Sequence, residues 1–229
     1  MMGGKRLVLL ALIIACFAGC KQYAYHASPP MPGSSYFPQT YGSAWQYRDS
    51  VYGLATDTFP LIGPKIDIVT YTMNGSTTDF NSMICYNASV TSQLYGKRTA
   101  YYYANKHTIG IFDTTPPWGF TTLDILMDKA PPGYTWVSNP SLYLVLNGSP
   151  VQAINTILET NVIRVVNGQT FTNVVHTGIN FQINVNGAGF HNIAYLDFYL
   201  APGVGIIEKD ASYYGYLNET ETLLSYTIK

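Results

Sequence analysis

The side chains best suited to acid–base or metal chemistry are spread thinly along this chain. Its four histidines are His26, His107, His176 and His191. Neither His-x-x-x-His nor Cys-x-x-Cys occurs, so the spacing gives no support for a metal site. No catalytic motif accompanies any of these histidines. We therefore expect no metal and no cofactor, and we expect each sheet histidine to be a surface or hydrogen-bonded residue.

Candidate nucleophiles and carboxylate pairs also lack a recognisable pattern. There is no Gly-x-Ser-x-Gly elbow, and Cys85, the one cysteine beyond residue 20, is expected to be a buried, small apolar residue. Asp124 and Asp128 would share a strand face about 13 Å apart, too far for an adjacent acid and nucleophile. We expect them to be solvated. Gly203-Val204-Gly205 lacks the third glycine and the helix of a dinucleotide loop. The sequence thus predicts no catalytic residue.

Tyrosine is the unusual component of the composition. The chain has 20 of them, including Tyr101-Tyr102-Tyr103, Tyr213-Tyr214 and Tyr216. Tyrosine suits strands and half-buried sheet faces, which is the interpretation we favour. The alternative is a concave surface for a sugar or a lipid, because a tyrosine ring has an apolar body and a polar tip.

The first twenty residues have the pattern of an export signal. Lys5 and Arg6 precede an apolar run from Leu7 to Ala18 that is too short to span a bilayer. Phe17-Ala18-Gly19-Cys20 resembles the lipobox of bacterial lipoproteins, which implies cleavage before Cys20 and acyl chains on it. Ile13-Ile14-Ala15-Cys16 is a rival lipobox that would leave a shorter apolar run, and an ordinary signal peptide with incidental cysteines is the remaining alternative.

These features predict the organisation of the chain and its location. Residues 1–19 are a lipoprotein signal peptide, residues 20–40 a Pro-rich flexible tether, and residues 41–229 a single β-rich domain. Several acyl chains would anchor the protein stably in the cell envelope, in our interpretation in the outer membrane, on a face that the sequence does not specify. The part after residue 19 carries ten Lys and Arg against thirteen Asp and Glu, which argues against nucleic acid as a partner.

The stretch Ile193–Glu208 organises the expected domain. Alternation puts Ala194, Leu196, Phe198 and Leu200 on one face of a strand, with Tyr195, Asp197 and Tyr199 on the other. Ala201-Pro202-Gly203 then reverses or bends the chain before a second apolar strand. Pro202, Gly203 and Gly205 are the predicted turn or bend residues.

Asn-Gly pairs between apolar runs indicate hairpins, because both residues tolerate a positive φ. They occur at Asn74-Gly75, Asn147-Gly148, Asn167-Gly168 and Asn186-Gly187. Other expected strands are Ala44–Ser50, Ile66–Met73, Ser82–Val90, Arg98–Tyr103, Thr108–Phe112, Thr122–Met127, Leu142–Leu146, Asn161–Val166, Thr170–Thr177, Ile179–Val185 and Leu223–Ile228, with Val151–Glu159 either a strand or a short helix. The fold class predicted is mainly β: a single antiparallel, strongly curved sheet, a half-open barrel or sandwich-like, with little helix.

The second half resembles β-rich envelope lipoproteins of the TapB-like family. The resemblance rests on Gly133-Tyr134-Thr135-Trp136, on the hairpin strand Gly168–Val174, on Tyr199–Glu208 and on Leu223–Tyr226. It covers roughly the last hundred residues, and its motifs are structural. It implies an architecture similar to the LolA-like lipoprotein carriers, a curved antiparallel sheet forming a half-open barrel, and it transfers no catalytic residue.

Three functions remain open at this point. The first is a membrane-anchored, non-enzymatic module whose curved sheet binds an apolar ligand or an envelope protein partner, with apolar inward positions around a cavity of roughly a few hundred Å³. The second is a structural accessory of a surface secretion or glycan-uptake assembly, with a flat exposed aromatic patch. The third, an enzyme, needs titratable groups that converge in one pocket.

Overall fold

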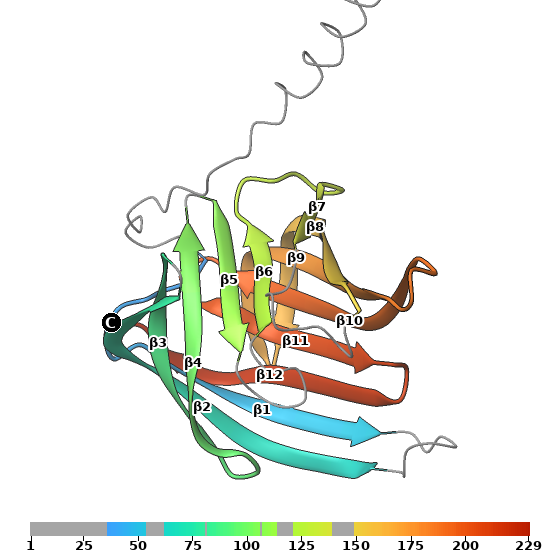
Figure 1. Cartoon of the computed structure of the whole chain (residues 1–229). Helices are drawn as coiled ribbons and strands as arrows, with labels where there is room; N and C mark the ends of the chain where they lie inside the picture. Colours follow the sequence, from blue (N-terminus) through green and yellow to red (C-terminus); the bar gives the residue numbers. More distant parts are fainter. Residues whose placement is uncertain (1–35, 54–61, 81, 106, 114–120, 139–148) are drawn as a thin grey trace, which may run out of the picture.

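The computed structural model describes residues 36–53, 62–80, 82–105, 107–113, 121–138 and 149–229. These residues form a single antiparallel sheet of twelve strands that is nearly closed into a barrel (Figure 1). The described part of the chain contains no helix long and apolar enough to cross a membrane. The predicted fold class, a mainly β protein built on one strongly curved antiparallel sheet, is confirmed.

The sheet is a meander in which chain neighbours pair with each other. The strands are β1 (Ala44–Gly53), β2 (Ile62–Phe80), β3 (Met83–Ser92), β4 (Gly96–Asn105), β5 (Thr108–Asp113), β6 (Thr121–Met127), β7 (Thr135–Ser138), β8 (Val151–Val166), β9 (Gln169–Asn184), β10 (Phe190–Ala201), β11 (Gly205–Tyr213) and β12 (Leu217–Thr227). Strands β1 and β12 pair with each other, so the order runs from β6 through β1 and β12 to β7. The two ends of the sheet are therefore consecutive in the chain.

Strong curvature folds one half of the sheet over the other. In Figure 1, β4–β6 cross in front of β9–β11, and β6 contacts β8 and β9 without pairing with them. The inner faces of both halves supply the buried core. Because side chains alternate along each strand, every second residue of these strands points into this interior.

Strand β10 shows how the sequence produces this core. Leu196, Phe198 and Leu200 are buried, while Tyr195 on the opposite face is half exposed. This alternation confirms the prediction made for the stretch. Burial of each large apolar side chain contributes roughly 1.5–3 kcal/mol, and this favours one register over a slip by one residue.

The core also takes up a residue from the segment expected to be tether. Phe37 is buried, and its ring stacks on Trp45 at 5.7 Å and on Tyr102 at 4.3 Å between centroids. The Trp45 indole N–H donates to the carbonyl oxygen of Val204 at 2.6 Å. The packed body of the protein therefore includes residues before Tyr41, the predicted boundary.

Two of the Asn-Gly pairs make the expected turns. Asn167 and Gly168, with φ of 48° and 80°, form the two-residue connection between β8 and β9. Asn186 and Gly187, with φ of 53° and 75°, lie in the connection between β9 and β10. The pair at residues 147 and 148 lies outside the described residues.

The hairpin predicted at Asn74-Gly75 is wrong, because β2 runs through it to Phe80. The register of β2 against β3 shifts between Met73 and Thr77, so the pair belongs to a bulge. The Asn74 side chain accepts hydrogen bonds from the backbone N–H and the hydroxyl of Ser76, at 3.0 and 2.7 Å. Gly75, with φ of 77°, thus supplies the positive φ of this bulge.

Other boundaries also differ from expectation. Val151–Glu159 is strand, continuous with the predicted strand at 161–166, and together they make β8. Thr170–Thr177 and Ile179–Val185 are one strand, β9. The short β7 was not predicted. The expected strand Leu142–Leu146 lies outside the described residues.

Candidate functional site

Four ionisable residues lie side by side on the inner face of the sheet. In successive strand pairs, Lys209 of β11 is opposite Glu221 of β12, Glu221 is opposite Asp49 of β1, and Asp49 is opposite Asp67 of β2. Like charges directly opposite each other destabilise a sheet. Such a row therefore needs either compensating contacts or a function.

Three of these residues, Lys209, Glu221 and Asp49, border a pocket of about 160 Å³ between the two halves of the sheet. One wall comes from β1, β2 and β10–β12, and the other from β4, β5 and the β3–β4 turn. The lining residues are mainly tyrosines, ionisable side chains and aliphatic or phenyl groups: Tyr47, Asp49, Val51, Tyr71, Tyr95, Arg98, Ala100, Tyr101, Tyr102, Ile111, Phe112, Phe198, Ile206, Lys209, Tyr213, Leu217, Glu219 and Glu221.

Lys209 holds two of the three pocket carboxylates. Its ammonium nitrogen lies 2.6 Å from Oε1 of Glu219 and 3.2 Å from Oε1 of Glu221. The Tyr213 hydroxyl donates to the other oxygen of Glu219 at 3.4 Å. Burial lowers the pKa of Lys209, but the two glutamates raise it by more, so it lies well above its ordinary value. Lys209 is therefore a permanent cation.

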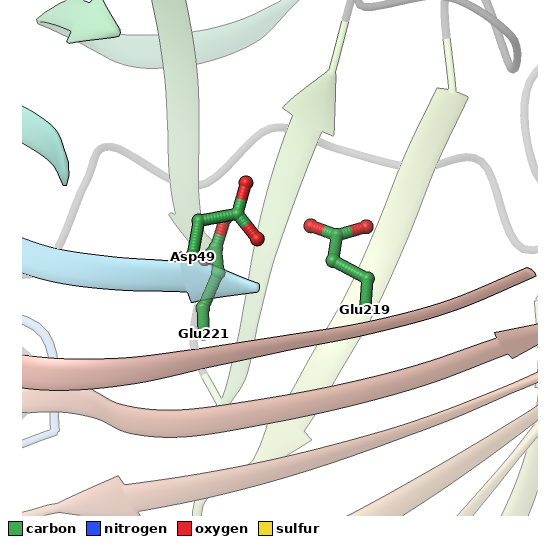
Figure 2. A group of neighbouring side chains, drawn as sticks. All are labelled: Asp49, Glu219 and Glu221. Atoms are coloured by element: carbon green, nitrogen blue, oxygen red, sulfur yellow. The ribbon is translucent and has the colours of Figure 1, made fainter. Parts of the chain in front are cut away.

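Asp49 is the pocket carboxylate that forms no ion pair with Lys209. The residue is 3% exposed, and its Oδ1 has no hydrogen-bond partner. One oxygen each of Asp49, Glu219 and Glu221 lie within 4.8 Å of one another, and Figure 2 shows the three side chains rising toward one another from neighbouring strands. Burial raises the pKa of Asp49 to about 7, with Glu221 and Glu219 adding to the effect and Lys209 opposing it.

Asp67, the next carboxylate in the row, is fully satisfied and structural. It accepts hydrogen bonds from the Ser92 hydroxyl at 2.5 Å and from the backbone N–H groups of Ile68, Gln93 and Leu94 at 2.7, 3.0 and 3.2 Å. Burial alone would raise the pKa of Asp67, but these donors outweigh it and lower the pKa. Asp67 therefore anchors the β3–β4 turn and stays ionised.

Comparison with known proteins finds only distant likeness. The chain matches no protein-family model and no curated protein. Two solved structures align over most of its length. One is a protein of Bacteroides fragilis described as exported and of YmcC-like fold, with 11% identity, 84% of this chain and 98% of that chain covered and a TM-score of 0.44. The other is a protein of Parabacteroides distasonis described as a lipoprotein, with 13% identity, 83% and 97% coverage and a TM-score of 0.44. At this similarity the comparison carries no argument about function, so the assignment below rests on this chain's own residues.

None of the three histidines that the structure describes lines the pocket. His176 lies between Glu159 and Asp197, with ring nitrogens 3.2 and 2.9 Å from their carboxylate oxygens, and it stacks on Tyr199 at 4.2 Å. Burial lowers the pKa of His176, but the hydrogen bonds to Asp197 and Glu159 raise it by a larger amount, so the pKa lies above its ordinary value. It is a hydrogen-bonded sheet histidine, on the face opposite Phe198.

His107 lies 3.1 Å from Asp128, and His191 is exposed. His26 and the predicted lipidation site, Cys20, lie outside the described residues. Pro202, Gly203 and Gly205 are found where β10 connects to β11, with φ of 71° at Gly203 and 105° at Gly205. The described residues His107, Asp128, His191, Pro202, Gly203 and Gly205 are absent from the lining of the pocket.

The expectation that Asp124 is simply solvated is wrong. The Tyr103 hydroxyl donates a hydrogen bond to its carboxylate, and burial raises the pKa of Asp124 although that bond opposes the rise. The expectation for Cys85 is confirmed, since it is fully buried and burial raises the pKa of its thiol to about 12.

The pocket carboxylates and Lys209 were not singled out from the sequence, although a signal was present. Asp49 follows Trp45 and Tyr47 in the same alternating phase, and these two aromatic residues are buried. Glu219 and Glu221 are in phase with the buried Leu223 in the same way. An ionisable residue in the buried phase of a strand costs free energy unless it has a partner, so it marks a candidate site.

Proposed function

We propose that this chain is a lipid-anchored, non-enzymatic envelope protein that binds a small ligand in the pocket of its half-open barrel. The observation that carries the proposal is the buried carboxylate of Asp49: the residue lines the pocket, and its Oδ1 has no hydrogen-bond partner. Native proteins rarely leave such a group unpaired without a reason, since each one costs roughly 1–3 kcal/mol.

The anchor is supported by the sequence of the leader. A basic start, a short apolar run and Ala18-Gly19 directly before Cys20 are typical of lipoprotein export. Several acyl chains on one cysteine would hold the protein at a membrane, with residues 21–35 as a tether between the membrane and the sheet. The sequence resemblance to TapB-like and LolA-like lipoproteins belongs to the same proposal.

The residues that line the pocket limit the class of ligand that it can bind. We expected inward positions that are apolar and incompletely filled, but the wall also carries three carboxylates, Lys209 and Arg98 among tyrosine rings. A purely apolar ligand would dehydrate these groups and leave Oδ1 of Asp49 without a partner. The proposed ligand therefore has a polar or charged group together with an apolar part.

A binding role suits the chemistry better than catalysis. The Glu219 and Glu221 carboxylates are engaged by Lys209, so neither is held ready as a free base or nucleophile. Cys85 is buried as a thiol, and His176 faces away from the pocket.

Native mass spectrometry of the protein purified from its own envelope tests both parts of the proposal. We expect a mass for a chain that starts at acylated Cys20, plus a bound small molecule that is lost when the protein unfolds. Cys20→Ser should release the protein from the membrane, and Cys16→Ser, which alters the rival lipobox, should leave it anchored. A chain with an unmodified Cys20 would refute the anchor, and a protein without bound molecule would refute the ligand.

A further inference from the structure

The charges around the pocket do not balance. Three carboxylates, Asp49, Glu219 and Glu221, face two cationic side chains, Lys209 and Arg98, which leaves a formal charge of −1 when all five are ionised. In a partly buried site an uncompensated charge is costly. A proton on Asp49 or a bound monovalent cation would remove it.

The unpartnered oxygen of Asp49 shows where such a cation would bind. Lys209 contacts Glu219 and Glu221, at 2.6 and 3.2 Å, and no ion pair joins it to Asp49. Oδ1 of Asp49 has no donor in the described structure. Asp49 lines the pocket, and terminal carboxylate torsions are broad, so a rotation about the Cβ–Cγ bond would allow this oxygen to accept a hydrogen bond from a donor in the pocket.

The surroundings favour an organic cation over a metal ion. A divalent ion bound to the three carboxylates would need oxygens at about 2.0–2.6 Å, and the Lys209 ammonium already occupies the space beside Glu219 and Glu221. The remaining wall consists largely of tyrosine rings and apolar groups such as Val51, Ile111 and Leu217. Aromatic faces attract organic ammonium groups, and apolar walls take up their carbon atoms.

We propose that the pocket binds a small organic ammonium ion, with the cationic group hydrogen-bonded to Asp49 and Glu219 and the apolar part against the tyrosine-lined wall. This inference rests on the proposed function, since it names the class of ligand that the pocket takes. It also explains why a protein would keep three carboxylates within 4.8 Å of one another on the inside of its sheet.

A proton and this ligand compete for the same carboxylate. The groups that face Asp49 are Glu221 and Glu219 of β12, Lys209 of β11 and Asp67 of β2, with Tyr95 of the β3–β4 turn nearby. Because burial and the glutamates favour the protonated form of Asp49, lowering the pH adds a proton that the cation has to displace. Affinity for the ammonium ion should therefore fall as the pH drops from about 8 to about 5.5.

Isothermal titration calorimetry of the full lipidated protein in detergent tests the inference with four probes. Benzylammonium is the organic cation, benzyl alcohol its neutral analogue, benzoate its anionic analogue and calcium chloride the metal ion. We expect benzylammonium to bind with one-to-one stoichiometry and the other three to bind at least about tenfold more weakly, since a hydrogen bond between charged groups accounts for about that factor.

Matched variants identify the carboxylate responsible. Asp49→Asn should weaken benzylammonium about tenfold or more and remove most of its pH dependence. Glu219→Gln should weaken it in the same direction. Asp210→Asn, a similar change on the other face of the neighbouring strand β11, where Asp210 accepts a hydrogen bond from Thr220, should leave the affinity unchanged.

Several outcomes would overturn the inference. Benzyl alcohol binding as tightly as benzylammonium would show that the aromatic wall alone selects the ligand, and calcium binding to the same carboxylates would show a metal site. Equal affinity of wild type and Asp49→Asn would also refute it. If no probe binds but the natively purified protein carries a neutral molecule, this inference fails and the proposed function stands. If neither is found, both fail.

Discussion

Replacing Asp49 by asparagine should make the protein more resistant to unfolding at neutral and alkaline pH. The unfolded chain ionises this carboxyl near its ordinary pKa of 3.8, whereas in the folded protein its pKa is about 7. Between these values the folded state binds more protons than the unfolded state, so the free energy of unfolding falls as the pH rises and then levels off above about pH 7. Asparagine is neutral throughout, so the variant lacks this fall.

The size of the effect follows from the two pKa values. The difference between 3.8 and about 7 corresponds to about 4 kcal/mol, at about 1.4 kcal/mol for each pKa unit. Relative to wild type, Asp49→Asn should be within about 1 kcal/mol at pH 4, close to the pKa of the unfolded carboxyl, and more stable by up to about 4 kcal/mol at pH 8.

Urea unfolding followed by tyrosine and tryptophan fluorescence at pH 4, 5.5, 7 and 8 measures this difference. Asp210→Asn, on the outer face, serves as the control and should shift the free energy of unfolding by a similar small amount at every pH. A difference between Asp49→Asn and wild type that stays constant with pH would refute the reasoning. A variant that becomes less stable than wild type as the pH rises would show that Asp49 is ionised and well paired in the folded protein.

Three further predictions test the packing. Phe37→Ala should lower the free energy of unfolding by about 3–5 kcal/mol, because the Phe37 side chain is only 3% exposed. Tyr41→Ala, at a side chain that is 73% exposed, should have little effect. Equal effects of the two substitutions in urea unfolding would show that Phe37 is not part of the core. Gly110→Ala should cost about 1–3 kcal/mol, since the new Cβ would lie 2.0 Å from Cζ of the buried Tyr103 ring, and unchanged thermal stability would contradict that contact. Cys85, fully buried with a thiol pKa of about 12, should react with iodoacetamide at pH 8 only when urea unfolds the chain, whereas rapid labelling of the native protein would show an accessible thiol.

Local patterns were sufficient to predict much of the sheet. The alternation in β10 identified its buried face, and Asn167-Gly168 identified the turn between β8 and β9, because both signals depend on a few adjacent residues. The pair at Asn74-Gly75 has the same local signal but lies in a bulge. There the pairing of β2 with β3 continues to Phe80, and that pairing depends on contacts between residues distant in the sequence.

The pocket was harder to predict for the same reason. Asp49, Glu219 and Glu221 each stand in the buried phase of a strand, which one strand's sequence can reveal. Their meeting depends on the pairing of β1 with β12, the first and last strands in the sequence. No local sequence pattern predicts that pairing. Lys209 lies beside the carboxylates because the register of β11 against β12 places it opposite Glu221. The prediction of an apolar interior was therefore incomplete. Apolar residues in the buried phase of the strands form the core, and the few ionisable residues in the same phase form the site.

The account depends most on the state of the Asp49 carboxyl, and carbon-13 NMR of the folded protein measures it directly. We predict that the Asp49 carboxyl carbon, assigned by its loss in Asp49→Asn, titrates with a pKa of about 7 and that saturating benzylammonium lowers this pKa. A carboxyl that titrates near its ordinary value of 3.8, or one whose titration benzylammonium leaves unchanged, would contradict the account.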